Sequence, residues 1–217
     1  MKNKLFILIK IAVLVNLFIS LINKEWTAIF ICLFNFILLY LVDYLQKKFD
    51  YNNLFKLLIY IFLVSSLIGG EIYFLYSKIW FYDIILHIFS SFIVSGFFLY
   101  IFKLFKCNIN KFLFMLCIFS FAMMIASLWE IAEFSIDRLF DVDMQKDTVI
   151  NEVNSMLLSD NGNVVVKNKI SSMTIGKYIV NGYLDIGLYD TINDMVCAII
   201  GSLIFIIYIF YKEKKLL

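Results

Sequence analysis

Long apolar stretches, almost free of charged residues, constrain this chain more than any other feature. Crossing about 30 Å of hydrocarbon takes roughly 20 helical residues, and the 217-residue sequence has several stretches of about that length. They are continuously apolar, whereas strands of a membrane barrel alternate between apolar and polar residues. The stretches lie at about 5–22, 26–45, 54–75, 80–102, 112–136 and 191–211. The sequence therefore predicts an all-α membrane protein, a six-transmembrane-helix bundle, with residues 1–217 forming one integral membrane domain.

The composition supports a membrane environment and argues against a nucleic-acid partner. Hydrophobic residues make up 63% of the chain and charged residues only 17%, which is far from the composition of a soluble domain. The formal net charge of +2 gives little attraction for a polyanion. We therefore expect membrane lipid as a partner and no nucleic acid, and no pattern in the sequence identifies a protein partner.

Lysines gather on one side of the expected bundle. With six spans, both termini share a side with the second and fourth connections, and the short connections opposite hold only Lys24 and Lys78. Only Asp43, Asp50 and Glu213 among the 17 acidic residues fall on the lysine-rich side. Its lysines are Lys2, Lys4, Lys47, Lys48, Lys56, Lys103, Lys106, Lys111, Lys212, Lys214 and Lys215. The positive-inside rule therefore predicts that both termini are cytoplasmic.

Glycines mark two places where helices are expected to depart from ordinary packing. The chain has no proline. The pair Gly69 and Gly70 is therefore the position within a span where the sequence predicts a distortion of the helical backbone. In the last span, Gly201 is expected to permit a close contact with a neighbouring helix.

The connection between the fifth and sixth stretches, 137–190, is a polar loop of roughly fifty residues, much longer than most connections. We expect it to be extracytoplasmic and to form a small β-hairpin cap. Residues 156–158 and 164–166 read as strands around an Asn161-Gly162 turn, and residues 178–180 form another β-prone segment before Asn181-Gly182.

Ionisable residues inside a span are costly in lipid and are therefore candidate functional residues. Asp83 and His87 stand four residues apart in the fourth stretch, so they share a helical face. His87 is the only histidine. Counted from the expected outer end of its helix, it lies about 10 Å into the bilayer.

Two further acidic pairs approach the same expected outer side. Glu130 and Glu133, followed by Asp137, repeat along one face of the fifth stretch, and Asp190 and Asp194 open the sixth. Charged groups at that depth need water or one another. We therefore predict that the fourth, fifth and sixth helices surround one outward-facing acidic and histidine-containing cavity.

Carboxylates with one imidazole and no thiolate suit a divalent cation such as Mg²⁺, Mn²⁺, Ca²⁺ or Zn²⁺. Glu130 and Asp194 are also candidate acid and base residues, because crowded carboxylates hold protons at higher pH. Arg138, the only arginine, is a weak candidate for phosphate binding. The candidate metal ligands are His87, Asp83, Glu130, Glu133, Asp190 and Asp194.

Structural roles compete with each of these assignments. Asp83 and His87 can form a pair that ties helices together, and carboxylates at helix ends can simply face the wet interface. Asp190 stands where an aspartate commonly caps a helix. Arg138 has acidic neighbours, Asp137 and Asp141, that it can pair with.

Three motifs in about residues 80–205 resemble the YjdF-like group of uncharacterised bacterial integral membrane proteins. They are Tyr82–His87, Leu128–Phe134 and Asp190–Met195, the last followed by Ala198 and Gly201. A looser likeness is to VanZ-like membrane proteins, although Ala198 replaces an asparagine expected there. Asp185 lies five residues before Asp190 instead of three, so the resemblance gives it no role. The resemblance implies a multi-pass protein of the bacterial inner membrane and supplies no reaction.

Three functions remain open at this point, and the sequence does not decide whether the chain is an enzyme. The cavity can bind a divalent cation and act on, or recognise, a lipid or envelope component from the outer face. The protein can instead be an ion- or proton-coupled carrier, although a continuous polar path through the spans is missing. In the third case it is a non-catalytic envelope scaffold whose polar cluster locks helices together.

Overall fold

The computed structural model describes residues 2–106, 109–160 and 162–212. Six helices in this part of the chain are long and apolar enough to cross a membrane, which confirms the prediction of six. They are α1 (Lys2–Asn23), α2 (Trp26–Phe49), α3 (Asn53–Leu63) with its π-helical continuation η1 (Val64–Ile72), α5 (Tyr82–Leu104), α6 (Lys111–Phe140) and α7 (Leu188–Lys212). A single turn, α4 (Leu75–Lys78), precedes α5. Asn161, Glu213, Lys214 and Lys215 lie outside the described residues.

The chain divides into two compact units. One comprises the residues up to Ala126 and those from Val196 onward, and the other is Ser127–Met195. Helices α6 and α7 run continuously from one unit into the other. The first unit is a helical bundle, and the second contains the ends of these two helices and the long connection between them.

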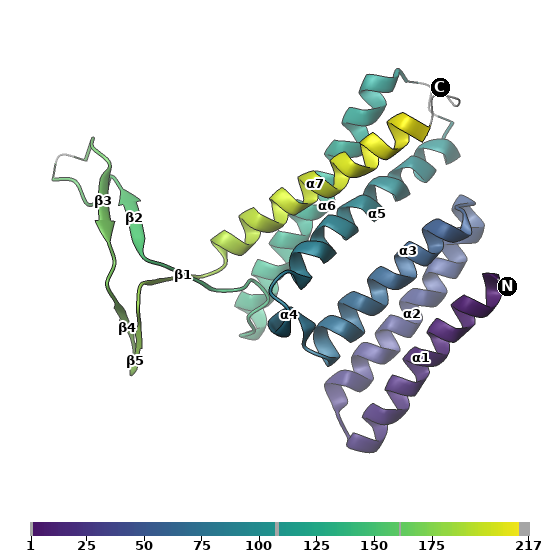
Figure 1. The fold of residues 1–217 in the computed structure, drawn as a ribbon, viewed down its shortest axis with the longest axis horizontal. Helices are drawn as coiled ribbons and strands as arrows, with labels where there is room; N and C mark the ends of the chain where they lie inside the picture. Colours follow the sequence, from purple (N-terminus) through teal and green to yellow (C-terminus); the bar gives the residue numbers. More distant parts are fainter. Residues whose placement is uncertain (1, 107–108, 161, 213–217) are drawn as a thin grey trace. The chain divides into compact units, whose positions relative to one another are not determined.

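Helices α1, α2 and α3 pack against one another in the first unit (Figure 1). Their shared core includes Val13, Leu39 and Tyr60, whose side chains are almost fully buried. The connection from α2 to α3 is short because Asp50 adopts a left-handed conformation, and the Asn52 side chain then accepts a hydrogen bond from the Phe55 N–H at 2.9 Å. An asparagine at this position caps one of the helix donors that have no partner within the helix.

Small residues let α5 approach two neighbours closely. A Cβ added at Gly96 of α5 would stand 2.4 Å from the Phe55 ring of α3, and one at Gly201 of α7 would stand 2.1 Å from the Ile88 carbonyl oxygen of α5. The close contact predicted for Gly201 is therefore confirmed. Ser95 and Ser202 are fully buried beside these glycines, as expected where helix backbones approach each other in a membrane.

The third span changes from α-helix to π-helix near the predicted glycine pair. Asn35 of α2 is fully buried and donates through Nδ2 to the Leu63 carbonyl at 2.8 Å, directly before η1 begins. A Cβ at Gly70 would stand 2.1 Å from the Tyr76 ring. The wider helical turn thus coincides with a position where only glycine fits, which accounts for a distortion without proline.

The connection between α6 and α7 contains six short strands in three antiparallel pairs: β1 (Thr148–Ile150) with β6 (Tyr183–Asp185), β2 (Glu152–Ser155) with β3 (Val166–Lys169), and β4 (Met173–Ile175) with β5 (Tyr178–Val180). The β2–β3 pair lies further from the Asn161-Gly162 position than the sequence suggested. Five apolar residues fall between the two strands, and each is at least 49% exposed: Met156, Leu157, Leu158, Val164 and Val165. These apolar residues gain no buried face here, so their β propensity alone does not extend the ladder.

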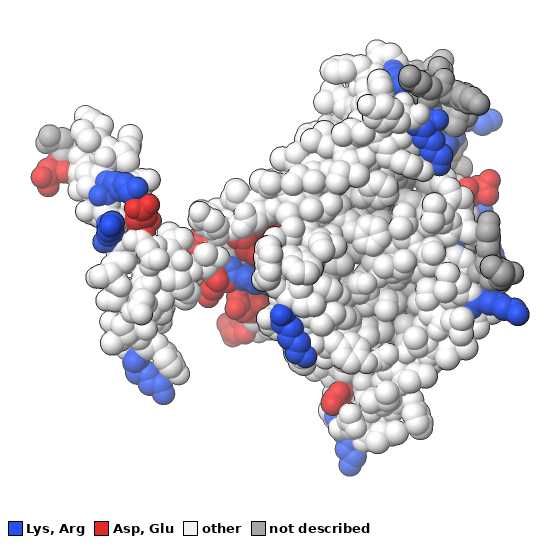
Figure 2. Space-filling view, in the orientation of Figure 1, with Lys and Arg blue, Asp and Glu red and all other residues white. Residues whose placement is uncertain are grey.

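Charged side chains of the helical bundle concentrate at helix ends. Figure 2 shows the helix surface between those ends as an almost uncharged area. Trp26 and Trp80 stand at the start of α2 and just before α5, and they are 78% and 83% exposed. Indole rings prefer the headgroup layer of a bilayer, so these positions are consistent with the ends of membrane spans.

Candidate functional site

Three carboxylates converge within the unit Ser127–Met195. Glu130 and Glu133 belong to α6 and Asp194 belongs to α7, and one oxygen from each lies within 4.8 Å of the other two. The three residues are 6%, 8% and 4% exposed, respectively. The spacing of three residues along α6 places both glutamates on the face toward Asp194, so these three predicted residues do come together. We call them the carboxylate trio.

The trio has its own local support in α6. Trp129 donates from Nε1 to Glu133 Oε1 at 2.8 Å, across one helical turn. The Trp129 residue itself is 51% exposed, so an indole at the surface orients a carboxylate in the interior. A side chain fixed in this way loses less freedom when it binds a ligand.

The segment that follows α6 folds back and is held by aspartate-to-backbone hydrogen bonds. Asp137 accepts from the Met144 and Gln145 N–H groups at 2.7 and 3.0 Å. Gln145, which is buried, then donates from Nε2 to the Thr191 hydroxyl at 2.7 Å. This segment therefore connects the end of α6 to the first turns of α7, and Asp137 acts there as a cap for the backbone.

Asp190 has a similar backbone contact. Its Oδ2 accepts a hydrogen bond from the Lys146 N–H at 3.0 Å, and among the described residues it is not part of the carboxylate trio. Asp190 and Asp194 are thus separated in their surroundings, although they lie one turn apart on α7.

No role was predicted for Asp185, yet it shapes the start of α7. Its carboxylate is buried and accepts a hydrogen bond from the Tyr189 N–H at 2.7 Å. Gly187 has a φ of +94°, and a Cβ there would stand 2.6 Å from Gln145 Cβ. An aspartate followed two residues later by glycine is the sequence signal that indicates this entry into the helix.

The C-terminal end of α6 and the segment after it are acidic. Partial burial, and then the charges of Asp147 and Asp137, raise the pKa of the Asp143 carboxyl. The Arg138 guanidinium lies 5.4 Å from the centre of the Phe134 ring on the exposed side of α6. The described contacts therefore leave phosphate binding by Arg138 a prediction.

Asp83 and His87 form the predicted pair in the first unit. His87 Nε2 and Asp83 Oδ1 are 3.4 Å apart on α5, and their side chains are 18% and 16% exposed. Ser90 donates to the His87 carbonyl at 2.9 Å. That this pair shares one cavity with the trio stays a prediction from the sequence.

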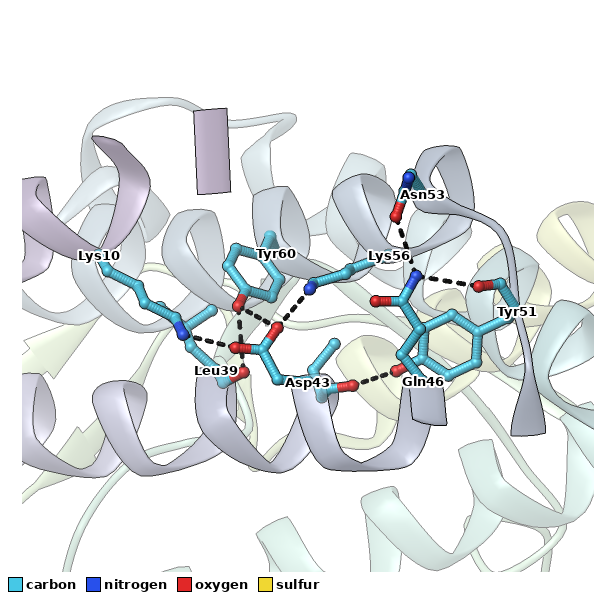
Figure 3. Close-up of polar contacts among 9 residues, drawn as sticks. Lys10, Leu39, Asp43, Gln46, Tyr51, Asn53, Lys56 and Tyr60 are labelled. Atoms are coloured by element: carbon cyan, nitrogen blue, oxygen red, sulfur yellow. Dashed lines mark hydrogen bonds and ion pairs between the residues drawn. The ribbon is translucent and has the colours of Figure 1, made fainter. Parts of the chain in front are cut away.

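A second polar cluster joins α1, α2 and α3 and was not assigned a role from the sequence (Figure 3). Asp43 of α2 pairs with Lys10 of α1 at 2.5 Å and with Lys56 of α3, and it accepts from the Tyr60 hydroxyl at 2.8 Å. Two lysines thus surround one carboxylate. Their ammonium groups also lie over aromatic rings, with Lys10 Nζ 3.8 Å from the Tyr40 ring centre.

The neighbouring connection is fixed to the same helices. Tyr51 is almost fully buried and donates to the Val42 carbonyl at 2.5 Å, while Gln46 Nε2 donates to the Tyr51 carbonyl and to Asn53 Oδ1, both at 3.0 Å. Burial and the Asp43 charge raise the pKa of Tyr51 above its usual range. The signal for this cluster was a charged residue at a similar depth in each of the first three spans.

A comparison with family models found a match to nearly the whole chain. The model described as "Predicted membrane protein (DUF2238)" matches residues 3–215. The chain belongs to this family. The match extends well beyond the motifs at 80–205 and is compatible with the YjdF-like resemblance, while the VanZ-like one stays a prediction. Comparisons with curated proteins and with solved structures found no match. The DUF2238 description supports the membrane assignment and names no activity.

Proposed function

We propose that this membrane protein binds a divalent cation at the carboxylate trio and uses that site to act on, or recognise, a lipid or envelope component. The single observation that supports cation binding is the convergence of three buried carboxylates from two helices. The further steps of the proposal, its lipid or envelope target and the outward orientation of the site, come from the sequence pattern.

Electrostatics explains why such a trio favours a cation. Ionised carboxylates within 4.8 Å of one another repel by about 3 kcal/mol or more at an effective dielectric constant of about 20. Protons or a cation must offset this repulsion. Two oxygens bound to one Ca²⁺ ion at 2.3–2.6 Å are at most about 5 Å apart, so the spacing is compatible with one shared ion.

The ligand atoms that the trio supplies determine which cation is expected. Glu130, Glu133 and Asp194 supply oxygen ligands only, and Mg²⁺, Mn²⁺ and Ca²⁺ prefer these. A contribution from His87, as the sequence predicts, would move the preference toward Zn²⁺. A bound cation would polarise a carbonyl or phosphoryl oxygen and lower the pKa of bound water, while Glu130 or Asp194 would exchange protons.

Metal content and stability test the proposal together. The protein is purified in detergent, treated with chelator, and its bound metals and thermal unfolding are measured with and without Mg²⁺, Mn²⁺, Ca²⁺ or Zn²⁺. We expect stoichiometric metal, and a stabilisation of about 2.7 kcal/mol at 100 times the Kd. Glu130→Gln and Asp194→Asn should each abolish both effects. Glu152→Gln, a control in an exposed carboxylate that pairs with Lys167, should retain them.

The stability of the variants without metal distinguishes a cation site from a purely structural cluster that locks helices together. Removing one of three mutually repelling charges should leave the metal-free protein as stable as before or more stable. A scaffold role predicts the opposite, because each substitution would remove a stabilising contact whether or not metal is present. Wild-type protein that binds no metal, with variants that are less stable, would contradict the cation site and support the lock. His87→Ala tests by metal loss whether the histidine belongs to the same centre.

A further inference from the structure

A groove of about 290 Å³ lies between α3, α5 and α7 at the lysine-bearing ends of these helices. Its lining includes the buried side chains of Phe55, Leu99, Phe205 and Ile209. All of these residues belong to the first unit. Gly96 lies directly against the Phe55 ring, where an added Cβ would stand 2.4 Å from a ring carbon, so α3 and α5 are in close contact at this position.

The rim of the groove is basic, whereas its floor is apolar. Lys103 of α5 and Lys212 of α7 both line it. Lys212 Nζ donates to the Tyr208 hydroxyl at 2.7 Å, and Asn52 Nδ2 donates to the Tyr100 hydroxyl at 3.2 Å. None of the described residues that line the groove is acidic. The groove therefore offers apolar contacts along its floor and two ammonium groups at its rim.

We propose that this groove binds one anionic phospholipid, with an acyl chain against the phenylalanine floor and the phosphate at Lys103 and Lys212. The helices that form it are membrane spans, so lipid is the ligand present at this depth. The volume of the groove is close to the lower limit for ligand pockets, about 300 Å³. A groove of this size suits a single acyl chain. Lysines at the membrane surface attract anionic headgroups, and Lys103 and Lys212 stand in the last turns of their spans.

Lipid titration of the delipidated full-length protein in detergent tests the headgroup contact. Native mass spectrometry measures the apparent Kd for phosphatidylglycerol and for phosphatidylcholine of the same acyl length. We expect phosphatidylglycerol to bind more tightly, and the double variant Lys103→Gln/Lys212→Gln to weaken it about tenfold, since each lysine near a surface contributes several-fold. Lys47→Gln/Lys48→Gln is the matched control, with two exposed lysines at the end of α2 outside the groove.

A second variant tests the acyl contact. Leu58→Trp adds a large side chain inside the groove and should weaken binding of both lipids without reducing the preference for phosphatidylglycerol in what binding remains. Equal affinity for the two lipids in the wild type would overturn the proposal. So would an unchanged phosphatidylglycerol affinity in Lys103→Gln/Lys212→Gln, or in a folded Leu58→Trp protein.

Discussion

At the scale of single residues, the membrane environment requires charged side chains within the spans to have partners. Asp43, Lys10 and Lys56 come from three helices, and each of their side chains is at most 27% exposed. An isolated ion at that depth would be costly. Because the carboxylate lies between two ammonium groups and also accepts from Tyr60, each charge has a partner, and the cluster fixes how α1, α2 and α3 pack.

Asp43→Asn should destabilise the protein by about 2 kcal/mol, because it leaves two neighbouring lysines without their shared counter-ion. This is less than the loss of a fully buried pair, about 3–5 kcal/mol, since the cluster is partly exposed. Thermal unfolding in detergent measures the change. Asp50→Asn is the control, because Asp50 is exposed and its left-handed conformation also suits asparagine. Equal unfolding temperatures for the two variants would show that the ion pairs contribute nothing.

At the scale of elements, η1 shows how backbone geometry follows from a local packing requirement. Residues Val64–Ile72 form the π-helical turns, and Tyr76 packs directly onto Gly70. The Tyr76 hydroxyl also lies 3.2 Å from the Ser66 Oγ. Glycine at position 70 thus lets the ring approach the helix backbone and connect the end of the third span to the short helix α4.

Gly70→Ala should destabilise the protein by about 1–3 kcal/mol, the range for overpacking a filled interior. The added methyl group would collide with the Tyr76 ring, and removing the ring should remove the collision. The double variant Gly70→Ala/Tyr76→Ala is therefore expected to be less destabilised than the sum of its two single variants. A double-mutant cycle by thermal or chemical unfolding measures this coupling. Strict additivity would mean that the ring is not what excludes a side chain at position 70.

At the scale of the whole molecule, the lysine distribution predicts an orientation in the membrane. Lysines stand at or near the connected ends of α2 and α3 (Lys47 and Lys56) and of α5 and α6 (Lys103 and Lys111), and at the C-terminal end of α7 (Lys212). The positive-inside rule predicts that those ends are cytoplasmic. The same rule predicts that the long α6–α7 connection is extracytoplasmic, together with the end of α6 that bears the carboxylate trio.

Cysteine labelling tests this orientation. In a variant without the four native cysteines, a cysteine replacing the exposed Asn163 should react with a membrane-impermeant maleimide in intact cells. A cysteine replacing Lys48 should react only after the cells are permeabilised. Gel-shift analysis of both variants gives the result, and the reverse pattern would show that the protein is inserted the other way round.

The candidate site could be predicted from the sequence only in part. The period of an α-helix was enough to pair Glu130 with Glu133 and Asp83 with His87, because residues three or four apart share a face. Asp190 and Asp194 share that spacing too, yet Asp190 bonds to the Lys146 backbone while Asp194 joins the glutamates. Helical spacing does not say which neighbour a side chain meets, since that depends on how the loop after α6 folds back.

By itself, the sequence determined the six spans, because burying apolar length in lipid depends on local composition and needs no knowledge of distant contacts. It also indicated the glycines at 69, 70 and 201, since they stood out in spans rich in large side chains. Only the tertiary structure decided that Lys10, Asp43 and Lys56 form one network, that the strands pair away from the apolar runs 156–158 and 164–165, and that a basic-rimmed groove lies between α3, α5 and α7. These features depend on distances between residues far apart in the chain, which helix packing sets and linear spacing does not.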